Sequence, residues 1–371
     1  MIIFGLFVLF VLIQSFHANF INAGLGTLPA ALPLPADKRK KVSVIICARN
    51  EAANLAKNLP SVLAQQYTSP DGSSLFEVVV VDDGSEDDTL KVLAALQAIH
   101  PQLRYFSADQ QGSISGKKNA LMQGVAFACS DWLLLTDADC MPAGDQWLQL
   151  MVAPLAHGRE IVAGYGGYNK LSGLLNAFIR WETLHTWMLY TAYAVGGRPY
   201  MAVGRNMACL KTTLQKAMQD PLWTILPSGD DDLFVSIAGT AANTSVVTAA
   251  AAFTHSPAKP TWHQWAHQKQ RHLSTGKYYK KQIKVSLGIY AGTHAGMWLL
   301  FFAALFTSFA LPAIALMSAR SLIQWGMWWV SARRLGDARL VYFFPLFDFG
   351  WMMYNFAFLP YITWKNKINW K

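Results

Sequence analysis

The sequence predicts an α/β domain built on a parallel sheet, with membrane-spanning helices at both ends of the chain. Three observations carry this prediction. Short apolar runs alternate with helical segments from Val42 to about Gly239. Polar residues, most of them acidic, follow directly after those runs. Both ends of the chain are strongly apolar, which is typical of membrane anchoring.

Composition supports the same division. The chain has 371 residues, of which 53% are hydrophobic and 14% charged, so it is apolar for a soluble protein. The net charge of +9 is concentrated beside the apolar runs, which is typical of membrane-flanking charge. No nucleic-acid motif accompanies it, so we expect no nucleic-acid partner. The four cysteines form no C-x-x-C pair and are interpreted as small buried residues in a reducing compartment.

The first segment is predicted to be a transmembrane anchor over residues 1–22. Residues 1–36 contain no charged side chain, and residues 1–21 are long enough, at about 1.5 Å per residue, to cross a membrane. The basic run at 38–41 places the following segment in the cytoplasm. A cleaved signal peptide is the alternative, but the basic start that it requires is missing. A Pro/Ala linker over 28–36 follows the anchor.

The middle of the chain, residues 36–285, is predicted to form one cytoplasmic domain. Strands are expected at 42–48, 76–85, 103–108 and 131–140, and helices at 51–66, 88–100 and 117–129. Strands that are apolar throughout are buried on both faces, so helices should cover both sides of the sheet. Ligands of such sheets bind beyond the carboxyl ends of the strands. The polar residues at those ends are Arg49, Asn50, Asp82, Asp83, Asp137 and Asp139.

The last part, residues 286–371, is predicted to be a membrane region with two or three helices. Residues 292–317 are long enough to span a bilayer, and 340–364 nearly so, although Asp348 and Asn355 interrupt them. The Trp-rich segment 320–335 is either an interfacial helix or a short third span. The basic tail at 365–371 favours the cytoplasm, but the number of crossings stays open.

Two acidic motifs follow predicted strands. Asp83, in V-D-D-G-S, can accept hydrogen bonds from a base or ribose, or the motif can be an Asx turn that caps the next helix. Asp137 and Asp139, in T-D-A-D, can share a hard cation such as Mg²⁺ or Mn²⁺, or they can be solvated turn residues. The apolar run before T-D-A-D favours the metal site, because it would bury the base of the motif.

A third acidic motif, S-G-D-D-D-L-F, spans residues 228–234. Three adjacent carboxylates repel one another, which raises some of their pKa values and suits a general base. The alternative is a helix start, where acidic residues are stabilised by the helix dipole.

Two basic motifs complete the set. Gly116 and Lys117, in G-K-K-N-A, begin a helix in a way that favours phosphate, although a solvated helix start fits equally well. Gln268 and Arg271, in Q-K-Q-R-H, share one helix face, and the arginine can hold a diphosphate with two hydrogen bonds. His263 and His267 have the i, i+4 spacing of a zinc pair, but without an obvious third ligand we interpret them as interface residues.

Together and in this order, these motifs resemble the family 2 inverting glycosyltransferases over residues 42–275. The resemblance rests on S-V-I-I-C-A-R-N-E, V-D-D-G-S, G-K-x-x-A, T-D-A-D, G-D-D-D-L and Q-x-x-R-H. The membrane-bound branch looks most similar, including ceramide glucosyltransferase and the synthases of cellulose and hyaluronan. The resemblance implies a GT-A fold, which is Rossmann-like, and a nucleotide-sugar donor, usually a UDP-sugar.

The resemblance also implies roles for individual residues. Asp83 would contact the uracil or ribose, and Ala48, Arg49, Asn50 and Glu51 would line the nucleotide pocket. Asp137 and Asp139 would occupy the D-x-D position, with Asp139 holding Mg²⁺ or Mn²⁺ on the diphosphate and Lys117 near the phosphates. Asp231 would be the general base, with Asp230 beside it. Gln268 and Arg271 would close over the diphosphate and acceptor. The segment 196–206 resembles an acceptor-side loop, or it is a flexible surface turn.

The expected reaction is transfer of one sugar, with inversion, to a lipid or lipid-linked acceptor at the cytoplasmic face of a bacterial inner membrane. His272 replaces the tryptophan that supports the acceptor sugar in polymerising members, which speaks against processive synthesis. The alternatives are a processive polysaccharide synthase subunit that works with a membrane partner, and an inactive nucleotide-binding scaffold. The intact set of carboxylates argues against the scaffold. A transporter does not suit the charged α/β middle of the chain.

Overall fold

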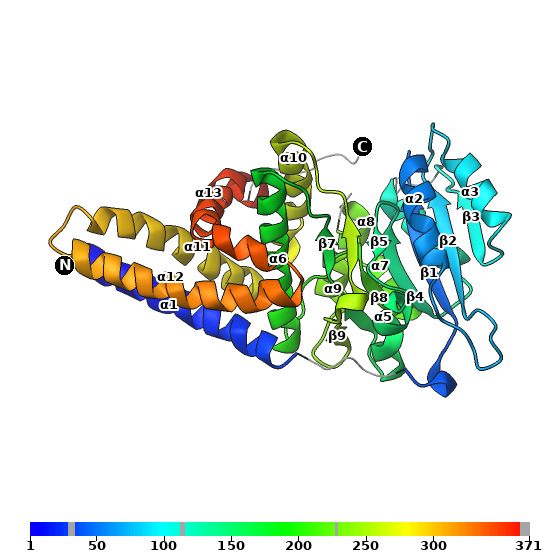
Figure 1. Ribbon diagram of the computed structural model, residues 1–371, viewed down its shortest axis with the longest axis horizontal. Helices are drawn as coiled ribbons and strands as arrows, with labels where there is room; N and C mark the ends of the chain where they lie inside the picture. The colour runs from blue at the N-terminus through cyan, green and yellow to red at the C-terminus, as the bar shows by residue number, and fades with distance from the viewer. Residues whose placement is uncertain (29–33, 112–115, 227–228, 364–371) are drawn as a thin grey trace. The chain divides into compact units, whose positions relative to one another are not determined.

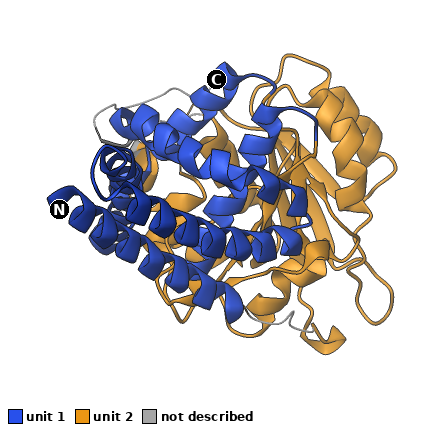
Figure 2. Ribbon diagram, turned by 60° about the vertical axis from the view of Figure 1, so that its left-hand side comes forward, with its two compact units in different colours: residues 1–27, 171–193, 260–366 blue, residues 28–170, 194–259, 367–371 orange. Residues whose placement is uncertain are grey.

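The computed structural model describes all residues except 29–33, 112–115, 227–228 and 364–371. Most of the predicted Pro/Ala linker, Ser228 and the basic tail therefore lie outside the described residues. The chain forms two compact units. One is an α/β unit made of 28–170 and 194–259, and the other is a helical unit made of 1–27, 171–193 and 260–366 (Figure 2). The predicted domain boundaries at 36 and 285 stay predictions.

The α/β unit is built on a seven-stranded sheet with the strand order β3-β2-β1-β4-β8-β6-β9 (Figure 1). The strands are β1 (Val42–Ala48), β2 (Phe76–Asp82), β3 (Leu103–Ser107), β4 (Trp132–Asp137), β6 (Ile161–Ala163), β8 (Met207–Leu210) and β9 (Thr244–Val246). A smaller sheet has the order β5-β10-β7, from β5 (Met141–Pro142), β7 (Gly166–Tyr168) and β10 (Thr254–Ser256).

The prediction of strands that are buried on both faces is confirmed. Val44 and Ile46 of β1 pack in one apolar core with residues of α2 (Ala52–Leu63) and α5 (Trp147–Ala156). On the other face, Val79 and Val81 of β2 pack with α4 (Lys117–Phe127). The remaining helices are α3 (Thr89–Gln97), α7 (Lys211–Met218), α8 (Pro221–Ile225) and α9 (Asp232–Ala238), with 3₁₀ turns η1 (Ala36–Lys38) and η2 (Ala250–Ala252). Alternating side chains therefore fill two separate layers, as the continuous apolar runs require.

The sheet is mixed, and this corrects the prediction of a parallel sheet. β1, β2, β3 and β4 are parallel, but β8 runs antiparallel to both β4 and β6. The sequence of β8, M-A-C-L, is only four residues long and carries no alternating pattern, so periodicity did not detect it. The antiparallel direction matters for the site, because the residues just before β8 lie at the same edge as the carboxyl end of β4.

The helical unit contains the long helices α1 (Ile2–Gly26), α6 (Leu174–Val195), α11 (Lys281–Ala304), α12 (Ala310–Arg334) and α13 (Phe344–Thr363). The shorter elements are α10 (Trp262–Leu273), η3 (Gly276–Tyr278) and η4 (Ala338–Phe343). Among the described residues, α1 and α11 are long and apolar enough to cross a membrane, judged by length and composition. The two pack along each other, with Phe7 and Met297 in a shared apolar cluster.

The prediction of one span over residues 292–317 is wrong, because a turn separates α11 from α12 at 305–309. The Thr307 hydroxyl donates to the carbonyl of Ala304 (2.7 Å) and accepts from the amide of Phe309 (3.1 Å). It thereby competes with the backbone hydrogen bonds that would continue the helix. The segment 320–335 is likewise not a separate helix, since most of it forms the second half of α12.

Asp348, which interrupts the last predicted apolar stretch, has buried partners within the helical unit. Its carboxylate forms two hydrogen bonds with the Arg320 guanidinium (2.5 and 3.1 Å) and one each with His294 (3.1 Å) and Trp298 (3.2 Å). These contacts join α13 to α11 and α12. A charged residue in an apolar helix is expected to be paired in this way.

Candidate active site

The carboxyl ends of β1, β2 and β4 meet at one edge of the large sheet, because the three strands are parallel and in register. Cys47 pairs with both Val81 and Asp137, so the segments that follow these strands begin side by side. The motifs expected at strand ends are therefore brought together in the α/β unit.

The two carboxylates of V-D-D-G-S have different surroundings. Asp82 accepts hydrogen bonds from the amide of Ser85 (3.2 Å) and the hydroxyl of Ser107 (3.3 Å), so it fixes the turn after β2. Asp83 is buried and accepts from Gln110 (3.1 Å) through one oxygen only. Among the described residues its Oδ2 atom has no hydrogen-bond partner. A buried carboxylate oxygen without a donor suits a ligand hydroxyl or N–H, as predicted for Asp83.

The segment after β1 forms a tight turn beside this motif. Asn50 has a φ of 56°, in the left-handed region that asparagine tolerates better than most residues. Its amide donates to the Ser85 hydroxyl (2.9 Å), and its side chain accepts from the amide of Glu86 (2.8 Å). Glu51 is partly buried, and burial raises its pKa although Asn54 donates to it. Ala48 is buried and Arg49 exposed at the same turn, and the predicted nucleotide contacts of all four residues stay predictions.

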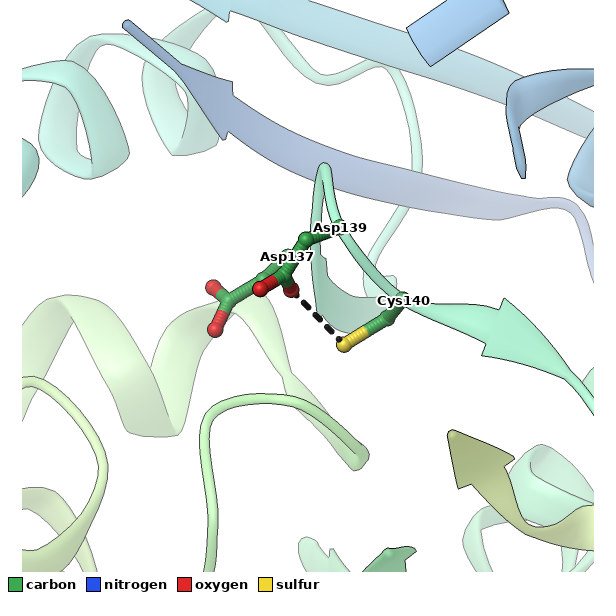
Figure 3. Close-up of side chains that lie close together, drawn as sticks. All are labelled: Asp137, Asp139 and Cys140. Atoms are coloured by element: carbon green, nitrogen blue, oxygen red, sulfur yellow. Dashed lines mark hydrogen bonds between the residues drawn. The ribbon is translucent and has the colours of Figure 1, made fainter. Parts of the chain in front are cut away.

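The T-D-A-D motif forms a compact acidic group at the end of β4 (Figure 3). One ligand atom each from Asp137, Asp139 and Cys140 lies within 4.8 Å of the others, and the Cys140 thiol is 3.4 Å from Asp139 Oδ1. Burial, and then the charge of Asp137, raises the pKa of Asp139. Burial also raises the pKa of the Cys140 thiol well above its usual value, so this sulfur stays protonated.

These observations test the fit of a divalent metal. Asp139 has a raised pKa beside the charge of Asp137 and forms no ion pair among the described residues, so a bound cation would stabilise its ionised form. Mg²⁺ and Mn²⁺ prefer oxygen ligands and leave the protonated thiol aside. Asp137 and Asp139 could therefore hold such an ion. Cys140 is a neighbour that the sequence analysis missed, and no spacing rule singles out one cysteine after D-x-D.

Lys117 connects this acidic group to the third acidic motif. Its ammonium lies 2.7 Å from Asp137 Oδ1 and 3.1 Å from Asp230 Oδ2. Burial disfavours its charge, but Asp137 and Asp230 together raise the pKa of Lys117 well above its usual value. Lys117 is thus a fixed cation between two carboxylates, and its predicted contact with phosphate stays a prediction.

The carboxylates of G-D-D-D-L differ in their state. Burial disfavours the charge of Asp230, yet Lys117 holds its pKa below the usual value. Burial, and then the charges of Asp230 and Asp232, raises the pKa of Asp231 to about 7. Asp231 accepts hydrogen bonds from the amides of Gly204 (2.6 Å) and Asp232 (2.8 Å). The motif also begins helix α9, which the alternative interpretation predicted, and the role of Asp231 as general base stays a prediction.

The segment before β8 is held in place next to Asp231 by the buried side chain of Asn206. Asn206 is fully buried and donates to the carbonyls of Tyr165 (2.9 Å) and Ala252 (2.7 Å). Its side-chain oxygen accepts from the indole of Trp147 (2.9 Å). This network fixes the Gly204 amide that donates to Asp231. The predicted contact of this segment with an acceptor stays a prediction.

Lys118 fixes the end of α8, the helix that precedes the third acidic motif, and the sequence did not predict this role. It is buried, and its ammonium donates to the carbonyls of Trp223 (2.8 Å) and Leu226 (2.9 Å) at the end of α8. The same ammonium lies 4.7 Å from the centre of the Trp223 ring, a favourable cation–π distance. A lysine next to Lys117 in a basic helix start carries no sequence signal for such burial.

Gln268 and Arg271 lie on α10, which belongs to the helical unit. The Arg271 guanidinium lies 3.4 Å from the ring of His272. Within that unit the neighbouring Lys269 pairs with Glu182 of α6. The predicted part of Gln268 and Arg271 in closing over the diphosphate stays a prediction.

The fold was compared with solved structures. The mannosyltransferase PcManGT from Pyrobaculum calidifontis, solved in complex with GDP-Man and Mn²⁺, superposes with a TM-score of 0.60 at 19% identity. The superposition covers 94% of this chain and 98% of that one. At this identity the likeness establishes the fold alone, and the predicted GT-A fold with terminal helices is confirmed. The fold class is therefore GT-A.

The sequence comparisons narrow the class to a family. Residues 43–208 match the family described as Glycosyl transferase family 2. Glycosyltransferase AglE of Haloferax volcanii is 34% identical over 125 residues, which are 33% of this chain and 38% of that protein. Beta-monoglucosyldiacylglycerol synthase of Trichormus variabilis is 31% identical over 122 residues, 33% of this chain and 25% of that protein. The match thus spans well under half of either relative.

The family prediction is confirmed by these matches. The finer resemblance to ceramide glucosyltransferase and to the cellulose and hyaluronan synthases stays a prediction, since the matches reach the family and no branch within it.

Proposed function

We propose that this chain transfers a sugar, with inversion, from a nucleotide-sugar donor to a lipid or lipid-linked acceptor at a membrane surface. One observation carries the proposal. Lys117 joins the D-x-D carboxylate Asp137 to Asp230, and the next residue, Asp231, has a pKa of about 7. A single-displacement transfer needs two carboxylates that can hold a metal ion. It also needs a nearby carboxylate that can take up and release a proton near neutral pH.

The chemistry of the proposed step follows from Asp231. Its carboxylate removes the proton from an acceptor hydroxyl, whose oxygen then forms a bond to the anomeric carbon. The bond from that carbon to the diphosphate oxygen breaks on the opposite face, so the configuration inverts. The amides of Gly204 and Asp232 orient the carboxylate, and Asp230 stays ionised through Lys117.

Asp137 and Asp139 would hold a divalent cation, which when bound neutralises charge on the departing diphosphate. Asp83, with one unpartnered buried oxygen, would accept hydrogen bonds from the base or ribose of the donor. A UDP-sugar is the donor we expect from the family resemblance. Arg271 and Gln268 of α10 would complete the diphosphate contacts.

The membrane assignment of this proposal rests on α1 and α11 together with charge. Both helices can cross a membrane by length and composition, and Lys38, Arg39, Lys40 and Lys41 follow α1. By the positive-inside rule, residues 36–285 would then face the cytoplasm. A lipid acceptor is supported by a relative that is named a monoglucosyldiacylglycerol synthase.

Release of nucleoside diphosphate tests the proposal. The detergent-purified chain would be incubated with UDP- and GDP-sugars, Mn²⁺ and a membrane lipid extract. We expect release from one donor that requires both the metal and the lipid. A ladder of products on a gel would favour the processive alternative. No release from any donor, with or without lipid, would refute the proposal.

The rate of transfer should depend on pH through Asp231. A general base works only when deprotonated, so log kcat/KM is expected to rise with pH below about 7 and to level off above it. The pH profile should be measured at saturating Mn²⁺ from about pH 5 to about pH 9, on both sides of the pKa of Asp231. A profile that is flat across neutral pH would contradict the assignment of the base.

Gly204→Ala tests how the base is held. A Cβ atom at this position would lie 3.3 Å from Asp231 Oδ2 and 3.5 Å from its Cβ, so the carboxylate must move. We expect kcat to fall about ten- to a hundredfold with unchanged donor affinity, because small displacements of reacting groups are costly. Gly144→Ala is the matched control, since its added Cβ meets only ordinary contacts, the closest at 3.5 Å.

A further inference from the structure

Arg205 is a half-buried cation at the same edge of the sheet as the D-x-D motif. It lies two residues before the antiparallel strand β8, whose pairing with β4 brings this segment next to Thr136. The hydroxyls of Thr136 (2.9 Å) and Thr254 (3.1 Å) both donate to its backbone carbonyl. The backbone of Arg205 is thus fixed from two strands.

The side chain is fixed as well, by neutral partners only. Its Nη1 group donates to the Ser256 hydroxyl (2.9 Å) and to the Gly167 carbonyl (3.4 Å). The guanidinium lies 4.2 Å from the centre of the Tyr168 ring. Gly166 leaves room for this packing, since a Cβ there would meet Arg205 Cβ at 3.1 Å and Nε at 3.4 Å. Among the described residues, Nε and Nη2 have no hydrogen-bond acceptor.

The charge of Arg205 is not neutralised by a carboxylate in the described part of the α/β unit. Lys117, the other cation of the site, is neutralised twice, by Asp137 and Asp230. Thr136, which donates to the Arg205 carbonyl, directly precedes Asp137, so the arginine lies beside the D-x-D motif without forming an ion pair with its carboxylates. A fixed arginine with unused donors beside a cation site is typical of sites that bind phosphate oxygens.

We propose that Arg205 binds the diphosphate of the donor, held for this purpose by Tyr168 and Ser256. The inference rests on the proposed function and adds a residue to it. The free Nε and Nη2 donors would contact phosphate oxygens of a diphosphate beside the cation that Asp137 and Asp139 would hold, and they would stabilise the charge that develops on the leaving nucleoside diphosphate. Lysine could supply the charge at this position but not the planar pair of donors.

Nucleotide binding to the full chain in detergent tests the proposal. UDP, GDP, UMP and GMP would be titrated calorimetrically with Mn²⁺ present, and Mn²⁺ alone would be followed by its paramagnetic resonance signal. For Arg205→Gln we expect the affinity for the diphosphate to fall about ten- to a hundredfold, as for a lost charge-assisted hydrogen bond. Monophosphate affinity should change less than about threefold. Affinity for Mn²⁺ alone should stay equal or rise, because a positive charge near the ion is removed.

Two variants serve as controls. Arg205→Lys should recover part of the diphosphate affinity. Arg159→Gln makes the same charge change at the opposite edge of the sheet, where Arg159 precedes β6 and donates to the Ala241 carbonyl (3.1 Å). It should leave all four affinities unchanged.

Several results would overturn the inference. Unchanged diphosphate affinity in Arg205→Gln would overturn it, even if the KM for the acceptor rises in that variant. Equal losses for monophosphate and diphosphate with a lower thermal midpoint would show a structural role instead. Failure of the unmodified chain to bind either diphosphate would refute the proposed function, and this inference with it.

Discussion

Replacing Asp231 by asparagine is expected to lower kcat by about 10²- to 10⁴-fold, the range that general bases contribute. The side chain keeps its size, and its oxygen can still accept from the Gly204 amide. The ability to take a proton is lost, and so is the hydrogen bond from the Asp232 amide, because asparagine has one acceptor oxygen where aspartate has two. Donor binding should stay close to that of the unmodified chain, because the candidate metal ligands Asp137 and Asp139 lie on a different segment. Single-turnover transfer and calorimetric titration with the nucleoside diphosphate would measure the two effects separately.

Asp232→Asn is the matched control for this prediction. It changes the adjacent residue, whose side chain accepts from the Leu233 amide (2.7 Å) at the start of α9, and asparagine can keep that hydrogen bond. Transfer should persist. Because the charge of Asp232 helps to raise the pKa of Asp231, the rising limb of the pH profile should move to lower pH. Equal loss of transfer in both variants would argue against Asp231 as the base.

The fold of the first half was accessible from the sequence for a simple physical reason. Runs such as V-V-V-V in β2 are too apolar to face water on either side, and the carboxylates after them end the run sharply. Parallel pairing then forces those ends together. The position of Asp83, Asp137 and Asp139 at one edge thus follows from periodicity alone.

The pairing of individual side chains was not accessible in the same way. Sequence could not separate Asp82, which closes a turn, from Asp83, which keeps an oxygen free. Lys117 looked like a phosphate ligand, yet it pairs with Asp137 and Asp230, which are 20 and 113 positions away along the chain. Such contacts depend on tertiary packing, which local patterns do not encode.

The second half was harder because its strands are short. β8 and β6 have four and three residues, too few for a reliable alternation, and the antiparallel insertion was therefore not predicted. Arg205 lies in the segment that leads into β8. In the helical unit, hydropathy joined residues 292–317 into one span, because a hydroxyl that ends a helix hardly changes the mean hydropathy.

Replacing Asp139 by asparagine is expected to abolish the metal response and to lower transfer at least about a hundredfold. The stability of the chain gives a readout that does not depend on turnover. A bound ion at about a hundredfold excess over its Kd stabilises the folded state by about 2.7 kcal/mol. The unmodified chain should therefore unfold at a clearly higher temperature with Mn²⁺ than without it, and Asp139→Asn should not.

Without metal, the same substitution should act in the opposite direction. Burial and the charge of Asp137 raise the pKa of Asp139, so its carboxyl binds a proton more tightly in the folded than in the unfolded state. Folding stability is then lost as pH rises from the unfolded value towards the folded one, and at neutral pH the ionised carboxylate destabilises the metal-free fold. Asp139→Asn removes that charge and should unfold at the same or a higher temperature than the metal-free unmodified chain. Asp131→Asn is the matched control. Asp131 is exposed and directly precedes the first residue of β4, so this substitution should leave both unfolding temperatures unchanged. Lower metal-free stability of Asp139→Asn would contradict a destabilising charge at this residue, and a Mn²⁺ shift equal to that of the unmodified chain would show that Asp139 does not hold the ion.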